Sequence, residues 1–151
     1  MNPDPTSGVI AHAIQLSIAP VFLLTGISGL LGVMANRLAR VIDRARTVEK
    51  TWRTLDANAK AAAMAEIGML ERRRRAISWS INFSTVAALL ICLVIVSLFV
   101  EEFFGGNLRL LAGTLFVLAM ISVICGLSCF LREVYLATHT TSIDPARFEG
   151  S

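Results

Sequence analysis

Three long stretches of this chain contain no aspartate, glutamate, lysine or arginine, and they constrain its fold more than any other feature. They cover residues 9–36, 76–100 and 110–131. A helix needs roughly 20 apolar residues to cross the ~30 Å hydrocarbon core of a bilayer, and each stretch is long enough. Because lipid offers no partners for backbone amides, helices are expected rather than open strands. The sequence predicts an all-α integral membrane protein with three transmembrane helices.

The overall composition favours the same class of protein. Apolar residues make up 55% of the 151 positions, and the mean hydropathy is +0.67. A soluble domain of this size buries only part of its surface, so it has no means of hiding this much apolar area from water. A lipid solvent removes that difficulty.

Basic residues are concentrated between the first two spans. Eleven of the 14 lysines and arginines lie in residues 37–75, whereas residues 101–109 carry one and residues 1–8 carry none. Short loops rich in Lys and Arg stay in the cytoplasm. We therefore expect residues 37–75 and the tail 132–151 in the cytoplasm, and residues 1–8 and the loop 101–109 outside.

The basic segment 37–75 is expected to form an antiparallel helical hairpin between spans 1 and 2. Apolar residues recur at helical spacing on both sides of Asp56 and Asn58, which favour a turn and a helix start. Two such amphipathic helices cover each other's apolar faces. The first stripe, which includes Trp52, is wider than one thin partner can cover. It is therefore expected to contact neighbouring subunits or another protein.

The arginines that follow the first span are the leading candidates for a binding surface. Guanidinium groups at this level can hold anionic lipid phosphates. The alternative is that they set topology and pair with Asp43 one turn away. The run Arg72–Arg75 is interpreted as a topology anchor with lipid contact. The candidate residues for lipid phosphate or assembly are Arg37, Arg40, Arg44, Arg46 and Trp52.

Small residues recur every third position in the first span, at Gly26, Gly29 and Gly32. Small side chains let helix backbones approach closely where lipid supplies no hydrophobic drive. These glycines are expected to pack against another helix, either within the protomer or across subunits. A pore lined by glycine is the alternative.

Polar residues inside or beside the spans have two interpretations each. Ser78, Ser80, Asn82, Ser84 and Thr85 are expected to hydrogen-bond between helices, and lining a wet lumen is the alternative. At the outer end, His12 and Gln15 are expected to be an interfacial pair, with an external vestibule as the alternative. Glu101 and Glu102 attract cations only if a symmetric ring repeats them.

Two segments resemble a known family. The run APVFLLTGISGLLGVMANRLARVIDRAR and the later pattern E-x-x-x-L-E-R-R-R-R-A-I are similar to small bacterial membrane proteins catalogued as a domain of unknown function. The resemblance covers residues 14–131, and its most specific part is N-R-L-A-R-x-x-D-R-x-R at residues 36–46. It implies three spans and a bacterial inner-membrane location, and it implies no activity.

The motifs of enzymes and of coupled transporters are missing from the sequence. No Asp, Glu, Lys or Arg lies centrally in a span, where proton-coupled pumps usually place an ionisable group. No cofactor, metal ion or nucleic acid is expected. We expect a non-enzymatic inner-membrane protein that self-assembles as a scaffold or accessory subunit and contacts anionic lipids. The alternatives are a homo-oligomeric channel, with arginines at its cytosolic mouth, and a subunit of one larger membrane complex.

Overall fold

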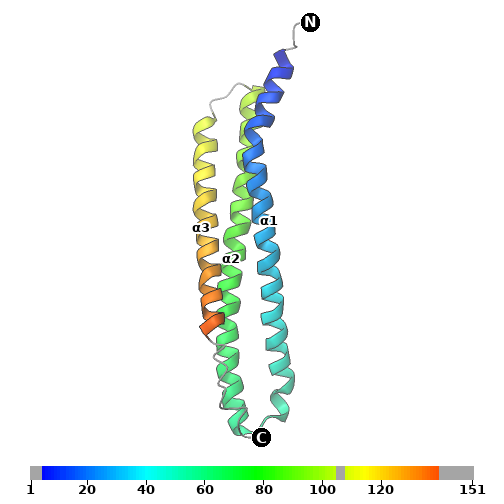
Figure 1. Ribbon diagram of the computed structural model, residues 1–151, viewed down its shortest axis with the longest axis vertical. Helices are drawn as coiled ribbons and strands as arrows, with labels where there is room; N and C mark the ends of the chain where they lie inside the picture. Colours follow the sequence, from blue (N-terminus) through cyan, green and yellow to red (C-terminus); the bar gives the residue numbers. More distant parts are fainter. Residues whose placement is uncertain (1–4, 105–107, 140–151) are drawn as a thin grey trace.

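A computed structural model describes residues 5–104 and 108–139, and nearly all of them are helical (Figure 1). The elements are α1 (Pro5–Thr51), the short 3₁₀ helix η1 (Trp52–Thr54), α2 (Ala57–Phe104) and α3 (Arg109–His139). The expected all-α class is confirmed. Each of the three long helices contains a segment long and apolar enough to cross a membrane. The run Gly105, Gly106 and Asn107, whose residue types favour a turn, lies outside the described residues.

Two of the helices are far longer than a bilayer is thick. α1 and α2 contain 47 and 48 residues, so each is about 70 Å long at 1.5 Å per residue. Each continues without a break from an apolar stretch into the basic segment, and the two lie side by side (Figure 1). α3 also runs past its apolar stretch, so residues 132–139 are helical.

The connection between α1 and α2 is short and capped. α1 ends at Thr51, and Leu55 is extended, with φ −80° and ψ 141°. The Asp56 carboxylate accepts a hydrogen bond of 3.0 Å from the Ala59 amide, which is the arrangement of an N-cap. The predicted helix start near Asp56 is therefore confirmed. Trp52 was expected on the face of the first helix; it is half-buried in η1 instead, because the helix ends one residue before it.

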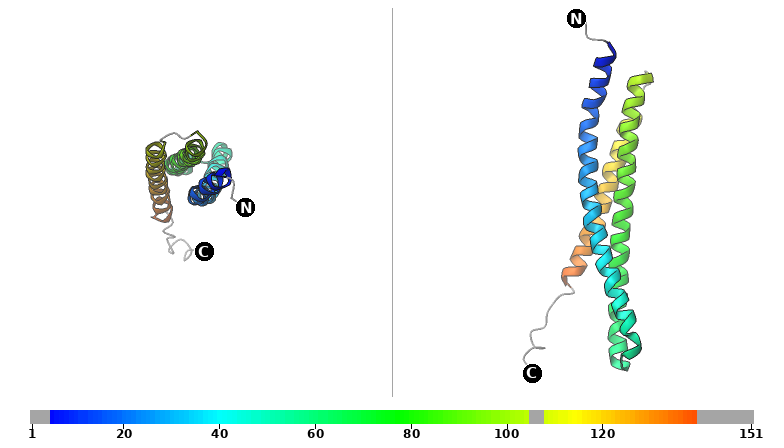
Figure 2. Two further views of the ribbon diagram at one scale, coloured as in Figure 1. Left: turned by 90° about the horizontal axis from the view of Figure 1, so that it is seen from above. Right: turned by 90° about the vertical axis from the view of Figure 1, so that its right-hand side faces the viewer.

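α2 is the central helix and packs against both of the others (Figure 2). One core cluster joins all three helices through small and branched apolar side chains, and a second joins α1 to α2 nearer the basic end. The first contains Ile27, Ala87, Ile91 and Ala119; the second contains Met34, Val41, Leu70 and Ile77.

α2 and α3 lie close together at Gly126. A Cβ atom at this position would lie 3.0 Å from Ser84 Oγ and 3.3 Å from the Ser80 carbonyl oxygen. Ser80 Oγ donates a hydrogen bond of 2.6 Å to the Gly126 carbonyl, and Ser122 Oγ donates one of 2.8 Å to the Phe83 carbonyl. The expected interhelical role is thus confirmed for Ser80. Thr85 instead donates to Ile81 of its own helix.

Candidate functional site

A buried carboxylate joins the three helices where the apolar stretches end. Glu133 of α3 is 0% exposed. One of its oxygens accepts a hydrogen bond from Arg37 of α1, and the other accepts two from Arg73 of α2, at 2.9 and 3.2 Å. A carboxylate that is removed from water needs such partners, since its desolvation costs several kcal/mol. The Arg37–Glu133–Arg73 cluster therefore ties α1 and α2 to α3.

The two arginines of this cluster are partly exposed to solvent, unlike the carboxylate between them. Their side chains are 36% and 32% exposed, while the carboxylate between them is fully covered. The guanidinium carbon of Arg37 also lies 5.2 Å from the centre of the Phe130 ring, one turn before Glu133 on α3. Both contacts place Arg37 against α3.

An arginine groove opens beside the cluster, between α1 and α2. It has a volume of about 200 Å³, and no carboxylate is among its lining residues, which are Arg37, Arg40, Val41, Arg44, Leu70 and Arg73. Arg44 Nε contacts Glu66 Oε1 at 2.6 Å, and this hydrogen bond raises the pKa of the guanidinium. Three of the lining arginines thus have carboxylate partners. Arg40 is exposed and makes none of the ion pairs found among the described residues.

The run Arg72–Arg75 does not act as one unit. Arg73 turns inward to Glu133, whereas Arg74 and Arg75 pair with Glu71 on the surface of α2. The hydrogen bond from Arg74 lowers the pKa of the Glu71 carboxyl. The expectation of a topology anchor therefore missed a residue that joins two helices. Arg46, another predicted candidate, lines a separate pocket of about 380 Å³ between α1 and α2 with Glu49 and Glu71.

Glu133 itself was missed because an acid beside Arg132, just past a span, resembles an ordinary solvated residue. Its position in the sequence did indicate that it could pair with arginines of the other helices. Glu133 is the acid that follows Arg132 at the end of the third span, and the chain carries arginine at the corresponding ends of the first two, at Arg37 and Arg75. Helices that end at the same level bring such opposite charges together.

The predicted helix-packing glycines make no close contact with the described residues of the other helices. Gly26, Gly29 and Gly32 are exposed, and a Cβ atom at any of them would meet nothing within 4 Å. Packing inside the protomer, one of the two arrangements expected for them, is therefore not found among the described residues. The reason is that α1 turns Ile27 and Met34 toward α2, which leaves the glycines on other faces.

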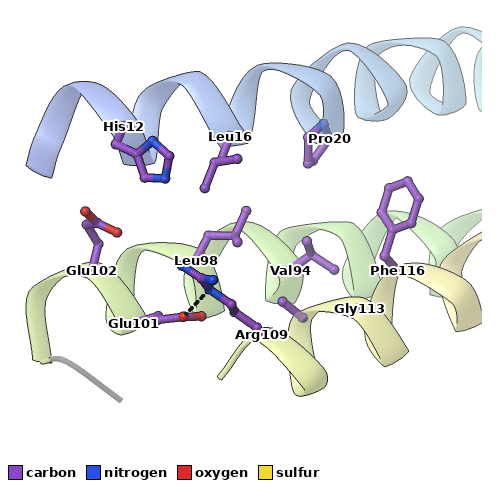
Figure 3. A pocket seen from close by; sticks show the side chains of 11 residues that line it. His12, Leu16, Pro20, Val94, Leu98, Glu101, Glu102, Arg109, Gly113 and Phe116 are labelled. Carbon is purple, nitrogen blue, oxygen red and sulfur yellow. Dashed lines mark hydrogen bonds and ion pairs between the residues drawn. The ribbon is translucent and has the colours of Figure 1, made fainter. Parts of the chain in front are cut away.

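A second pocket lies at the opposite end of the bundle. It is lined by residues of all three helices, including His12, Glu101, Glu102 and Arg109 (Figure 3). Arg109 Nε contacts Glu101 Oε1 at 3.1 Å. Within the described part of the chain, no cluster of three or more His, Cys, Asp or Glu residues has the geometry of a metal site.

Comparison with known proteins identified one family. A family model described as "Protein of unknown function (DUF2721)" matches residues 17–143. No curated protein and no solved structure matched the chain.

Proposed function

Because the chain belongs to the DUF2721 family of proteins of unknown function, we propose from its geometry that it is a non-enzymatic, multi-pass membrane protein that self-assembles as a scaffold or accessory subunit. The family confirms the resemblance found at residues 36–46. The proposed location is the bacterial inner membrane, with residues 1–8 outside and the α1–η1–α2 connection in the cytoplasm. The distribution of lysine and arginine supports this orientation.

The exposed glycine face of α1 is the observation that carries the self-assembly. Gly26, Gly29 and Gly32 give the helix a smooth surface, and nothing in the protomer occupies it. In lipid, surfaces of small residues favour close helix contact, because packing and weak hydrogen bonds replace the hydrophobic effect. A second copy of α1 is the partner of matching shape. The half-buried Trp52, at the tip of the connection between α1 and α2, contributes a second contact between the subunits.

Bulk on the glycine face is expected to break the assembly. The double variant Gly29→Leu/Gly32→Leu fills open space in the protomer, so its helix content should stay unchanged. We expect its dissociation constant in detergent to rise at least tenfold, which is about 1.4 kcal/mol per tenfold step. Sedimentation equilibrium measures this change. Ser128→Leu is the matched control, because it adds the same side chain to an exposed position of α3.

The same purified protein can be used to distinguish the scaffold proposal from the channel alternative. An oligomer that conducts ions in planar bilayers would replace the scaffold proposal with a homo-oligomeric pore. A wild-type protein that is monomeric at every concentration would contradict both. Copurification of one copy with a larger complex would favour an accessory subunit.

Anionic lipids are the proposed partners of the arginine groove. Four arginines line it, and the carboxylates Glu66 and Glu133 neutralise part of their charge from outside the lining. A net positive charge therefore remains at the level where phosphate headgroups would lie. Arg40 supplies the guanidinium with no carboxylate partner among the described contacts.

Neutralising Arg40 is expected to weaken the binding of phosphatidylglycerol. One basic residue near an anionic surface contributes about 1 kcal/mol, so Arg40→Ala should reduce the affinity roughly fivefold. Titration of the detergent-solubilised protein, followed by native mass spectrometry, measures this affinity. Arg53→Ala removes the same charge from the tip of the hairpin and should have no effect. Equal losses for both variants would contradict a specific groove.

A further inference from the structure

The pocket at the outer end of the bundle has no role in the proposed self-assembly. Its volume is about 630 Å³, within the usual range for sites that hold small molecules. All three helices contribute to it, because α1 and the α2–α3 pair face each other across it (Figure 3). Its lining residues are His12, Leu16, Pro20, Val94, Leu98, Glu101, Glu102, Arg109, Ala112, Gly113 and Phe116.

The part of this pocket that lies nearest the middle of the bundle is apolar. Pro20 of α1, Val94 of α2 and Phe116 of α3 lie toward the middle of the helices, away from the charged residues (Figure 3). These residues belong to the apolar stretches of their helices, so this part of the pocket suits a hydrocarbon chain.

The rim of the outer pocket carries charges of both signs. Glu102 of α2 and His12 of α1 point toward one another across the opening (Figure 3). Glu101 Oε1 accepts a hydrogen bond from Arg109, while Glu101 Oε2 is buried and has no partner among the described residues. A buried carboxylate oxygen without a donor is unfavourable, because its lost hydration is not replaced. The site therefore calls for a ligand with N–H or O–H donors.

The charge balance indicates what kind of donor fits. Two carboxylates and one guanidinium leave the rim with one net negative charge when His12 is neutral. A primary ammonium group supplies three donors and the opposite charge. The Arg109 side chain is 83% exposed, so its remaining N–H groups are available to a phosphate.

We propose that the outer pocket binds a zwitterionic phospholipid whose headgroup ends in a primary ammonium. The ammonium contacts Glu101 Oε2 and Glu102, the phosphate lies near Arg109, and an acyl chain fills the apolar part. This inference rests on the proposed membrane location but is independent of self-assembly. It also differs from the arginine groove in the charge of the lipid that is bound.

Native mass spectrometry of the solubilised full chain tests this site with phosphatidylethanolamine and phosphatidylcholine as probes. Choline carries a quaternary ammonium with no N–H donor, so it has nothing to donate to Glu101 Oε2. We expect phosphatidylethanolamine to bind at least tenfold more tightly than phosphatidylcholine. Glu101→Gln removes one of the two carboxylate charges at the rim and should reduce this preference. Gly113→Leu places a side chain in the pocket and should weaken the binding of both lipids.

Controls separate this inference from the function proposed above. Glu71→Gln neutralises a carboxylate far from the pocket and should leave lipid preference unchanged. Helix content by circular dichroism and oligomer mass should match the wild type in every variant. Equal affinity for the two lipids, or an unchanged preference in Glu101→Gln, would overturn the inference while leaving self-assembly intact. A protein absent from the membrane fraction would overturn the membrane location itself.

Discussion

Replacing both Arg37 and Arg73 by alanine is expected to destabilise the protein by about 3–5 kcal/mol, the cost of leaving a buried charge without its partners. The charge in question is the Glu133 carboxylate, which is 0% exposed and contacts both guanidinium groups. The two arginines are about a third exposed and can turn toward water, whereas the carboxylate is enclosed by helices. Unfolding by titration with sodium dodecyl sulfate, followed by circular dichroism, measures the change.

Removing the buried charge from this variant should restore part of the lost stability. The triple variant Arg37→Ala/Arg73→Ala/Glu133→Gln no longer buries an unpaired carboxylate, so we expect it to be more stable than the double variant. Glu133→Gln alone should cost less, about 1–2 kcal/mol, because the amide oxygen still accepts a hydrogen bond. Arg74→Ala breaks only an exposed ion pair and should have no measurable effect. A triple variant less stable than the double would contradict the assignment of Glu133 as the buried centre.

A leucine at Gly126 is expected to separate α2 from α3, at a cost of about 3 kcal/mol for overpacking. Already the Cβ atom would lie 3.3 Å from the Ser80 carbonyl oxygen, which belongs to the backbone and has little freedom to move. The larger side chain would also break the hydrogen bond of 2.6 Å from Ser80 Oγ to the Gly126 carbonyl. The same detergent titration measures this loss.

Gly113→Leu is the matched control for this variant, since it makes the same substitution in the same helix. A Cβ atom at Gly113 would meet nothing within 4 Å, so its stability should stay within ~0.5 kcal/mol of the wild type. Equal destabilisation by the two variants would contradict the special role of Gly126 in the α2–α3 contact, because leucine has a higher helix propensity than glycine at both positions.

The three long apolar helices of this fold could be predicted from the sequence because they depend on composition over long windows. Residues 76–100 and 110–131 each need only their length and lack of charge to indicate a helix. The helix start after Asp56 was also predictable, since capping depends on the few residues beside it. Such features need no knowledge of the helix on the other side of the contact.

The Arg37–Glu133–Arg73 cluster could not be predicted in this way, because it depends on which helix faces which. Four consecutive arginines occupy all sides of a helix, so their spacing alone leaves open that Arg73 is the one facing α3. The contacts of the glycines could not be predicted from the sequence for the same reason. The repeated glycines of α1 lie on exposed surface, while the less conspicuous Gly126 makes the close contact. A sequence shows which residues are small or charged; the rotation of each helix about its own axis decides what they touch.

The length of α1 beyond its apolar stretch divides the basic segment into two electrical environments. In the proposed orientation, the 15 residues from Arg37 to Thr51 carry the tip about 22 Å away from the lipid headgroups. Ions in the cytoplasm screen charges over a Debye length of about 8 Å. Arg37 and Arg40 therefore experience the surface potential of the membrane, and Arg53 at the tip does not. Partners that bind at the tip would consequently be selected by the protein surface alone, whatever the lipid composition beneath it.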